Sequence, residues 1–496
     1  MTDTPVRTTE VPALVAALGD ARVCGTLPTV VTGIAHDSRA VAPGYAFLAL
    51  RGERADGHAF LAAAAAAGAT VAIVDETFAG SNALPATLAT VVVPDTRRAL
   101  SRLSAAFYGY PSRSLRITGV TGTNGKTTTT HLIAAVCAAA GIAAGRIGTL
   151  GASFGDATWP LENTTPLALE TMALLAEMRD RGGRAVAMEV SSHALSLDRV
   201  ADIEFDIGVL TNITRDHLDF HPTFEAYAAA KKTLFDRTRV AILGLDDAQG
   251  ARWAAEFAAA GRRVVTYGLG PAADVRATGL SLGADGSAFS VDGIRFTLRL
   301  PARFNVENAL AALCVAREYG IADALTAGAL AAFDRVPGRM EHFSGDGVDV
   351  LVDYAHTPAA LEAVLRAARE TARRDVAVVF GCGGDRDSGK RPQMGALALA
   401  LADRTFVTSD NPRSEDPLRI IDEILAGMNS HEYVDVEADR RVAIRRAILE
   451  ALPGDIVVVA GKGHEDYQIV GTTASHFDDR DEVRAALAAR ALAQRA

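Results

Sequence analysis

The stretch "SLRITGVTGTNGKTTTTHLIAAVCAAAG", residues 114–141, decides the fold because it joins a β-prone run, a glycine-rich loop and a long helical run. The loop "GTNGKTT", residues 122–128, has one residue too many after the preceding glycine for the strict G-x-x-x-x-G-K-[ST] pattern. Its chemistry is still that of a phosphate loop, in which backbone amides at a helix start hold an anion. Lys126 can reach the terminal phosphates and Thr127 can ligate Mg²⁺. The stretch predicts nucleotide binding without naming the reaction.

Composition sets the broad class of the protein. The chain has 496 residues, of which 49% are hydrophobic and 22% charged, which is enough for two to four globular domains. A formal net charge of −10 argues against nucleic acid as a main partner. The four cysteines lie far apart in the sequence, so neither a zinc knuckle nor a disulfide framework is indicated. No apolar run reaches the ~18 residues of a membrane span, and no secretory pattern opens the chain. We therefore expect a cytoplasmic protein.

The order of the expected elements predicts an α/β protein of three parts, residues 1–113, 114–338 and 339–496. In the second and third parts, buried strands alternate with helices, which implies mostly parallel sheets. Residues 271–300 instead alternate apolar and polar positions around "ADG" and "VDG" turns, which is typical of antiparallel hairpins. Ligands of parallel sheets bind at the carboxyl ends of strands.

Two expected strand ends carry polar side chains. "AMEVSSHAL" brings Glu189 to the end of a buried strand, and "LTNITRDHLDFH" brings His217 after the next. Mg²⁺ prefers oxygen ligands, so Glu189 is the stronger candidate and His217 the weaker. Either residue alone could be a capping or core polar group. Lys231 follows on a helix, where a lysine is solvated by default.

Another polar loop stands in "TFVTSDNPRSEDPLRIIDEIL", residues 405–425. Asp416 is the expected N-cap of a helix with Pro417 at its first position. Its expected apolar face consists of Leu418, Ile421, Ile424, Leu425 and Met428. The loop "DNPR" before this helix is polar and stiffened by proline, which raises the question of what it holds.

The motifs GTNGKTT, EVSSH, RDHLD, GRME, DYAHTP, GCGGDRD-x-GKRP, DNPR and AGKGHEDYQ occur in an order that resembles the Mur ligases. These are ATP-dependent amide-bond enzymes of cytoplasmic peptidoglycan precursor synthesis. The resemblance covers nearly the whole chain, and the later motifs are similar to those of members that add the third residue of the stem peptide. It implies a smaller α/β N-terminal domain for the UDP end of UDP-MurNAc-L-Ala-D-Glu. It also implies a central P-loop ATPase-like parallel-sheet domain for ATP and a C-terminal Rossmann-like domain for the amino acid.

The resemblance further implies a reaction and its residues. ATP would phosphorylate the γ-carboxylate of D-Glu, and the amine of the amino acid would then displace phosphate. The implied catalytic residues are Lys126, Glu189, His217 and Lys231. The implied metal ligands for Mg²⁺ are Thr127, Glu189, His217 and Lys231, the last as an N-carboxylated lysine formed with CO₂. The implied ATP contacts are Gly122, Thr123, Asn124, Gly125, Lys126, Thr127, Thr128, Asn308, Arg339 and Asp353. The implied contacts to the uridine side of the UDP substrate are His36, Ser38, Glu53, Arg54 and Ala55. The implied contacts to its muramoyl-peptide portion are Asn163, Thr164, Thr165, Ser191 and Arg199.

The added amino acid in such enzymes is mainly meso-diaminopimelate or L-lysine, which differ by one distal carboxylate. Guanidinium groups are the best suited to bind a carboxylate, often through two hydrogen bonds. The "DNPR" motif resembles that of the diaminopimelate-adding enzymes. The implied contacts to diaminopimelate are Arg386, Asp410, Asn411, Pro412, Arg413, Gly461 and Glu465. The rival interpretations are a lysine-adding enzyme, a folylpolyglutamate synthase, and a P-loop switch or motor ATPase. The expected partners are these small molecules alone, and the expected form is a monomer.

Overall fold

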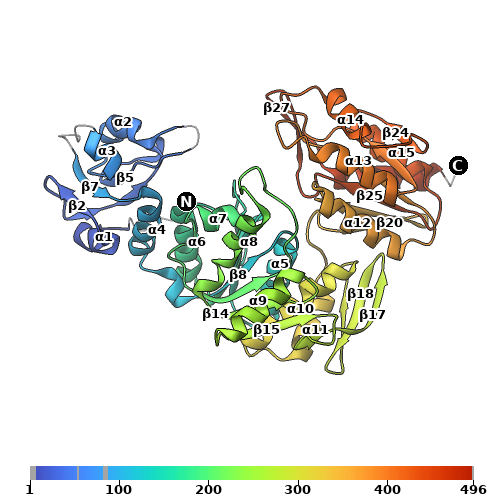
Figure 1. Ribbon diagram of the computed structural model, residues 1–496, viewed down its shortest axis with the longest axis horizontal. Helices are drawn as coiled ribbons and strands as arrows, with labels where there is room; N and C mark the ends of the chain where they lie inside the picture. Colours follow the sequence, from blue (N-terminus) through green and yellow to red (C-terminus); the bar gives the residue numbers. More distant parts are fainter. Residues whose placement is uncertain (1–6, 53–54, 82–87, 494–496) are drawn as a thin grey trace. The chain divides into compact units, whose positions relative to one another are not determined.

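The computed structural model describes residues 7–52, 55–81 and 88–493 of the chain. Its contacts group the chain into two compact units. The first unit contains residues 1–121, 142–208 and 229–240, and the second contains residues 122–141, 209–228 and 241–496. Figure 1 colours the elements along the chain, from blue at the N-terminus to red at the C-terminus.

The N-terminal part is built on a five-stranded sheet of order β2-β7-β6-β5-β4. The strands β4 to β7 run parallel, and β2 pairs antiparallel with β7. One face packs on α1 and α4 and the other on α2, because the strands are apolar on both sides. The bounds are α1 Val11–Leu18, β2 Arg22–Cys24, β4 Gly33–Ala35, β5 Tyr45–Leu48, α2 Leu61–Ala66, β6 Val71–Asp75, α3 Glu76–Ser81, β7 Ala89–Val93 and α4 Thr96–Phe107. A short sheet pairs β1 (Thr9–Glu10) with β3 (Val30–Val31).

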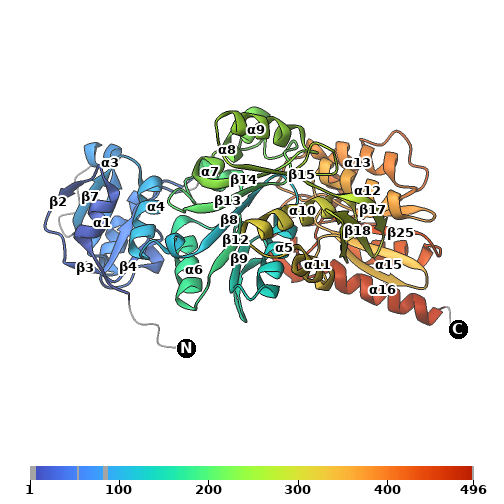
Figure 2. The same cartoon turned by 90° about the horizontal axis from the view of Figure 1, so that it is seen from below.

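A nine-stranded sheet follows in the order β11-β10-β9-β12-β8-β13-β14-β15-β16 (Figure 2). The pairs β9–β12, β12–β8, β14–β15 and β15–β16 are parallel, whereas β10 and β11 add antiparallel strands at one edge. The strands are β8 Arg116–Thr121, β9 Ala144–Gly148, β10 Gly151–Phe154, β11 Ala157–Trp159, β12 Ala185–Glu189, β13 Phe205–Leu210, β14 Thr238–Gly244, β15 Val264–Gly268 and β16 Val275–Arg276. The helices are α5 Lys126–Ala139, α6 Ala168–Asp180, α7 Ser192–Ser196, α8 Phe224–Lys232, α9 Ala248–Ala259, α10 Arg303–Glu318 and α11 Asp323–Ala332.

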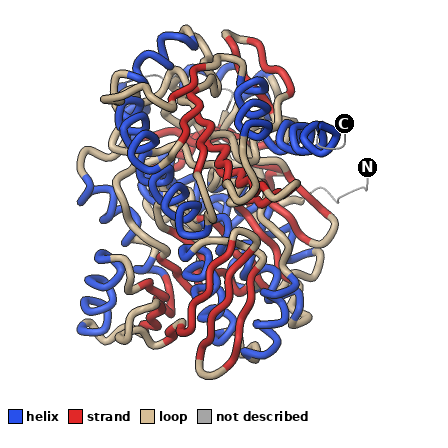
Figure 3. The backbone as a smooth tube through the Cα atoms, turned by 90° about the vertical axis from the view of Figure 1, so that its right-hand side faces the viewer, coloured by secondary structure: helices blue, strands red, loops and turns tan. Residues whose placement is uncertain are grey.

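The alternating segment forms a separate antiparallel sheet, as its pattern predicts. The strands β17 (Thr278–Gly283), β18 (Gly286–Val291) and β19 (Ile294–Leu298) pair in that order. Their long red strands and the turn between them are seen at the bottom of Figure 3. Phe289 and Phe296 stack as a cross-strand pair with ring centroids 5.3 Å apart, which secures the register.

The C-terminal part is a six-stranded sheet of order β20-β21-β25-β22-β23-β24, in which every pair except β20–β21 is parallel. The helices α12, α13 and α14 pack on one face and α15 and α16 on the other. The bounds are β20 Glu341–Gly345, β21 Val348–Asp353, α12 Pro358–Thr371, β22 Val376–Phe380, α13 Lys390–Leu401, β23 Arg404–Val407, α14 Pro417–Leu425, β24 Val434–Val436, α15 Arg440–Glu450, β25 Ile456–Ala460 and α16 Asp479–Ala493. A hairpin of β26 (Tyr467–Val470) and β27 (Thr473–His476) follows β25. The predicted α/β class is confirmed.

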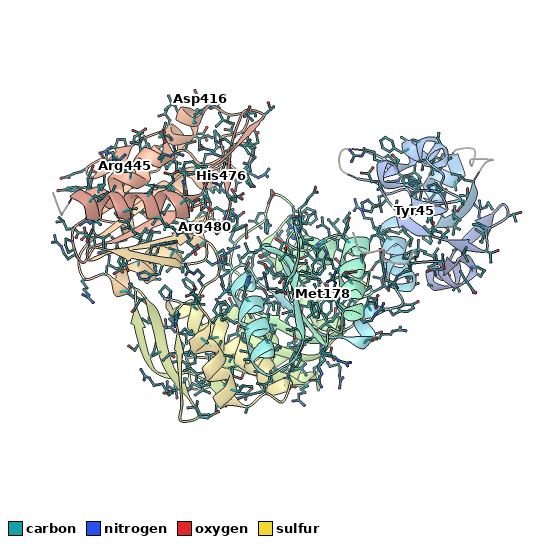
Figure 4. All side chains as sticks on the ribbon, turned by 180° about the vertical axis from the view of Figure 1, so that it is seen from behind. Tyr45, Met178, Asp416, Arg445, His476 and Arg480 are labelled. Carbon is teal, nitrogen blue, oxygen red and sulfur yellow. The ribbon has the colours of Figure 1, made fainter. Side chains whose placement is uncertain are left out.

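The start of α14 confirms one local prediction and corrects another. Asp416, labelled in Figure 4, caps the helix by accepting a hydrogen bond from the Leu418 amide, with Pro417 at the first position. The predicted apolar face is wrong at Leu418, whose side chain is exposed, and it omits the buried Ile420. Ile421, Ile424 and Met428 are buried as predicted, so the prediction differs only in the first turn of the helix, where packing covers Ile420 and leaves Leu418 exposed.

A fully buried ion pair joins two strand ends of the C-terminal sheet. Arg440 and Asp479 have side chains with 0% exposure, and their closest N···O distance is 2.7 Å. The same guanidinium donates to the carbonyl oxygens of Ser409 and Ala460, which follow β23 and end β25. The pair therefore fixes the two loops that leave these strands. None of the helices in the described ranges has the length and apolarity needed to cross a membrane.

Candidate functional site

The phosphate loop requires glycine at both ends. Gly122 has φ +145° and Gly125 has φ +85°, conformations that other residues rarely adopt. A Cβ at Gly122 would collide with the Thr211 hydroxyl, and one at Gly125 would collide with the Asn308 side chain. Gly125 is the N-cap of α5 and offers no side chain to its amides. Amide groups at this helix start can therefore receive an anion.

Asn212 fixes the conformation of this loop. Its Oδ1 accepts from the Asn124 amide at 3.1 Å, and its Nδ2 donates to the Asn124 carbonyl at 3.2 Å. The Thr123 amide donates to the Asn212 carbonyl, and the Thr123 hydroxyl accepts from the Thr214 amide. Both the oxygen and the NH₂ group of the Asn212 side chain, in the segment after β13, therefore hold the phosphate loop. Asn212 was not among the predicted contacts.

Lys126 and Thr127 lie at the start of α5, where the phosphate chemistry predicts them. Lys126 Nζ donates to the carbonyl oxygens of Gly122 and Thr123, each at 2.8 Å, so the ammonium lies across the loop. The buried Thr127 hydroxyl accepts from Arg339 Nη2 at 3.4 Å. The Arg339 guanidinium lies over the Tyr354 ring, 4.7 Å from its centroid. The second unit therefore places Arg339 beside the phosphate loop.

The other predicted ATP contacts are buried and bonded within the protein. Asn308 Oδ1 accepts from the Thr129 hydroxyl, and its Nδ2 donates to Asn305. This ties α10 to the start of α5. Asp353 Oδ2 accepts from the Met340 amide at 2.7 Å, and burial raises the pKa of this carboxyl to about 6. Asp353 therefore shapes the Arg339 segment by holding the next residue.

Glu189 lies in the first unit with a fully buried side chain. It ends β12 opposite Val120, two residues before Gly122 in the chain. One carboxylate oxygen accepts from the Thr149 amide at 2.9 Å and the other from the Thr149 hydroxyl at 3.1 Å. A Cβ at Gly148 would collide with this carboxylate, which explains the glycine there. A buried carboxylate with lone pairs left over is a ligand that suits Mg²⁺.

Four of the predicted muramoyl-peptide contacts gather around the same strand end. Thr164 hydrogen-bonds Thr149, while the Thr165 hydroxyl donates to the Glu189 carbonyl and accepts from the Ser191 amide. Arg199 Nη1 donates to the Thr165 carbonyl at 2.9 Å, and burial lowers the pKa of this guanidinium. Asn163, the fifth, is exposed on the adjoining loop.

The predicted uridine contacts are only partly described. His36 Nε2 lies 3.2 Å from Glu170 Oε1 on α6, and Ser38 opens a short 3₁₀ turn that Asp37 caps. Ala55 is exposed. Glu53 and Arg54 lie outside the described residues.

The predicted metal ligands belong to different units, so the structure does not test their combination. Glu189 and Lys231 are in the first unit, whereas Thr127 and His217 are in the second. His217 has φ +52° and a half-exposed ring near Asp216. Lys231 is buried, with 1% exposure, so the default expectation of a solvated helical lysine is wrong. Among the described residues no three His, Cys, Asp or Glu side chains gather as a metal cluster.

The "DNPR" loop lies against the loop that follows β22. Arg413 has φ +52°, and its backbone is held by the hairpin: its amide donates to Ile469, and its carbonyl accepts from Gly471. Its Nη1 donates to the Gly384 carbonyl at 2.8 Å. A Cβ at Gly383 would lie 3.0 Å from Arg413 Nη1 and 3.9 Å from Arg386 Cγ. Both predicted arginines therefore lie near Gly383.

Acidic and amide groups lie on the other side of this loop. Asn411 Nδ2 donates to Glu465 Oε2 at 2.9 Å, and burial raises the pKa of Glu465. Asp410 is buried beside Gly461, where a Cβ would lie 2.6 Å from its Oδ2. Pro412 is buried in the same loop. Hence two arginines and two carboxylates surround the carboxyl ends of β22, β23 and β25.

Three buried residues around this loop were missed by the sequence reasoning. Arg391 is 1% exposed, binds Glu415 with two hydrogen bonds of 2.8 and 2.9 Å, and also binds Glu423. Its presence holds the pKa of Glu415 at about 2. Lys462 and Arg440 are likewise fully buried. A basic residue inside a quoted motif, "GKRP" or "GKGHED", was the available signal for Arg391 and Lys462.

Models of one protein family match successive parts of the chain. The Mur ligase family catalytic domain matches residues 30–108, the Mur ligase middle domain matches residues 120–316, and the Mur ligase glutamate ligase domain matches residues 338–463. The chain belongs to the Mur ligase family. The predicted family is confirmed.

Three similar proteins carry the same name. The UDP-N-acetylmuramoyl-L-alanyl-D-glutamate–2,6-diaminopimelate ligase of Geobacter metallireducens is 44% identical, over 93% of this chain and 95% of its own. The protein of the same name from Thermosynechococcus vestitus is 47% identical, over 90% and 91%. A solved structure with that name superposes with a TM-score of 0.67 at 36% identity, covering 93% of this chain and 95% of its own.

The glycine at the start of α5 gives a first prediction. Gly125→Ala should weaken ATP binding at least about tenfold, because the left-handed backbone costs about 1 kcal/mol and the new Cβ meets Asn308. Calorimetric titration with an ATP analogue measures this. Gly141→Ala is the matched control, since Gly141 also has positive φ but open space around it. Equal nucleotide affinity in both variants would contradict the assignment.

Proposed function

We propose that this family member is the ATP-dependent ligase that joins meso-2,6-diaminopimelate to UDP-MurNAc-L-Ala-D-Glu. The relatives that bear this name are 44 and 47% identical over at least 90% of the chain. The observation that carries the choice of amino acid is that Arg413 and Arg386 both lie near Gly383, at 3.0 Å (Nη1) and 3.9 Å (Cγ) from a Cβ built there. Lysine, which lacks a distal carboxylate, would leave these cations without an anion.

The residues support phosphoryl transfer followed by amide formation. The loop amides and Lys126 position the nucleotide, and Arg339 adds a cation beside Thr127. The transferred phosphoryl group turns the D-Glu γ-carboxylate into an acyl phosphate. The amine of diaminopimelate attacks its carbonyl carbon, the C–N bond forms, and phosphate leaves with the electron pair of the C–O bond. The amine proton passes to solvent or phosphate.

The same proposal assigns the metal ligands. The residues that would hold Mg²⁺ are Thr127, Glu189, His217 and Lys231. When bound, Mg²⁺ would neutralise charge on the phosphates. The fit rests on the oxygen donors of Thr127 and Glu189. Lys231 would contribute as a carbamate formed with CO₂, which replaces a cation by an anion, and its burial fits a role other than a solvated cation.

The proposed domains are residues 1–113 for the UDP end of the substrate, 114–338 for ATP and 339–496 for the amino acid. His36, Ser38 and Ala55, with Glu53 and Arg54 beyond the described residues, would serve the first. We also propose a cytoplasmic monomer, and light scattering that gave twice the mass of 51.9 kDa would contradict the oligomeric state.

Phosphate release measured with each substrate omitted in turn tests the function. Phosphate should appear only when ATP, UDP-MurNAc-L-Ala-D-Glu and diaminopimelate are all present, because the amine is needed to consume the acyl phosphate. ATP hydrolysis without the other two would indicate a switch or motor ATPase. A clear preference for L-lysine or a folate substrate would favour the rival ligases.

Arg413→Ala should raise the KM for diaminopimelate at least about tenfold, since a hydrogen bond to a charged group contributes about 1.5–3 kcal/mol. The KM for ATP should stay within about twofold. Steady-state phosphate release measures both. Arg419→Ala removes an exposed arginine of α14, the helix that follows the "DNPR" loop, and serves as control. Parallel rises in both KM values would reject the carboxylate clamp.

Lys231→Ala should lose nearly all activity, because it removes the proposed anionic ligand. Addition of acetate or formate should restore part of the rate. The neighbouring Lys232→Ala variant should keep most activity. The ¹³C resonance of a carbamate on protein exposed to ¹³CO₂ gives a direct readout. Full activity of Lys231→Ala, or no carbamate signal in the parent protein, would refute this role.

A further inference from the structure

Lys462 is a fully buried lysine, with 0% exposure of its side chain. It lies among the loops that carry the predicted diaminopimelate contacts, which we call the amino-acid loops. It lies between two glycines just after β25. Its Nζ donates to Asn411 Oδ1 at 3.1 Å and lies 3.6 Å from Glu465 Oε2 and 3.8 Å from Asp410 Oδ1. It also faces the Tyr467 ring, 5.6 Å from the centroid. None of the functions described above uses this side chain.

The lysine and the Ile469 amide together decide which way the Asn411 amide points. Asn411 Oδ1 accepts two hydrogen bonds, from Lys462 Nζ at 3.1 Å and from the Ile469 amide at 3.0 Å. Both partners are donors, so the opposite side of the amide must be its NH₂ group. That group donates to Glu465 Oε2 at 2.9 Å. A reversed amide would set its oxygen against the carboxylate and its NH₂ against two donors. Lys462 therefore fixes Glu465 through Asn411.

Lys462 also sets the net charge of the cluster that it forms with Asp410 and Glu465. Asp410 and Glu465 both lie within 4 Å of the one ammonium, so the three side chains sum to a single negative charge when ionised. One ammonium of an incoming diamino acid balances that charge. Without the lysine, the buried Asp410 and the partly buried Glu465 would share a site in which the nearby Arg440 is already paired with Asp479, and the pKa of the carboxylates would rise. The acceptor for the substrate ammonium would then be lost.

We propose that Lys462 is a positioning residue of the amino-acid site, which holds Asn411 and Glu465 in the arrangement that receives the ammonium of the incoming amino acid. The lysine acts through these two residues and does not touch the substrate, since its side chain has no exposed surface. This inference rests on the proposed function, because it presumes that a diamino acid binds at these loops.

The test uses Lys462→Met, which keeps the length of the side chain and removes its charge. The KM for diaminopimelate should rise about tenfold or more, as expected for one lost charged contact. The KM values for ATP and the UDP substrate should stay within about twofold. A residue that only packs would change all three, or kcat alone.

The pH dependence of the KM for diaminopimelate gives a second readout. Burial and Asp410 already raise the pKa of Glu465, and Lys462 opposes them. The other groups facing Glu465 are Asn411, the Tyr354 hydroxyl at 3.5 Å, and the nearby Tyr467 and Arg440. Removal of Lys462 should raise this pKa further, so more Glu465 is protonated at low pH. The ratio of the variant KM to the parent KM should therefore fall between about pH 6 and about pH 9. Titration of the substrate cancels in that ratio.

Two further variants cover the other outcomes. Lys462→Gln keeps a donor towards Asn411 without charge, and its KM should lie between those of the parent and Lys462→Met. If Lys462→Met does not fold, the double variant Lys462→Met/Glu465→Gln should regain thermal stability, because it removes the carboxylate left without a counterion. An unchanged diaminopimelate KM, a ratio that does not vary with pH, or no recovery in the double variant would overturn the proposal.

Failure of the proposed function looks different. In that case the parent protein itself shows no diaminopimelate-dependent phosphate release. If the parent uses L-lysine instead, the same KM ratio measured with L-lysine tests Lys462, since both amino acids carry the distal ammonium. A Lys462→Met variant that handles L-lysine like the parent would then reject the inference.

Discussion

Side-chain amides that hydrogen-bond to loop backbone hold the candidate site together. A backbone group that leaves a sheet needs a new partner, because an unpaired buried amide or carbonyl costs free energy comparable to a lost hydrogen bond. Asn212 supplies both partners for Asn124 in the phosphate loop. Asn411 accepts from the Ile469 amide of the hairpin and donates to the Glu465 carboxylate, so it links these two groups. In each case one amide side chain fixes the conformation of a loop that could otherwise adopt several.

Buried ion pairs extend this control to whole strand ends. Desolvation of two charges offsets most of their attraction, so a buried pair is weak support for stability in itself. The structural role of the Arg440–Asp479 pair follows from the other contacts of the guanidinium. It donates hydrogen bonds to the carbonyl oxygens of Ser409 and Ala460. Arg391 likewise binds Gly383 while paired with Glu415 and Glu423. Both arginines lock the spacing of loops that carry the predicted diaminopimelate contacts.

Sequence reasoning succeeded where a local pattern determines the structure. The phosphate loop, the Asp416 cap and the antiparallel hairpins each depend on residues a few positions apart. It failed where packing decides, as at Leu418 and at Lys231, whose burial no helical period reveals. Two of the partners of Lys462, Asn411 and Asp410, lie about 50 residues earlier in the chain. Such contacts follow from topology and not from a motif, so a sequence could suggest only that the lysine is unusual.

Backbone strain marks the loop that would choose the amino acid. Arg413 and Asp385 both adopt left-handed φ values, +52° and +54°, which cost about 1 kcal/mol or more for a residue with a Cβ. The strain persists because surrounding contacts determine these positions several times over. The hairpin holds the Arg413 backbone at Ile469 and Gly471, and Ser414 binds the Asp385 carboxylate through its amide and hydroxyl. These contacts fix the backbone of Arg413, and a guanidinium carried on a fixed backbone loses less entropy on binding a carboxylate than one carried on a mobile loop would.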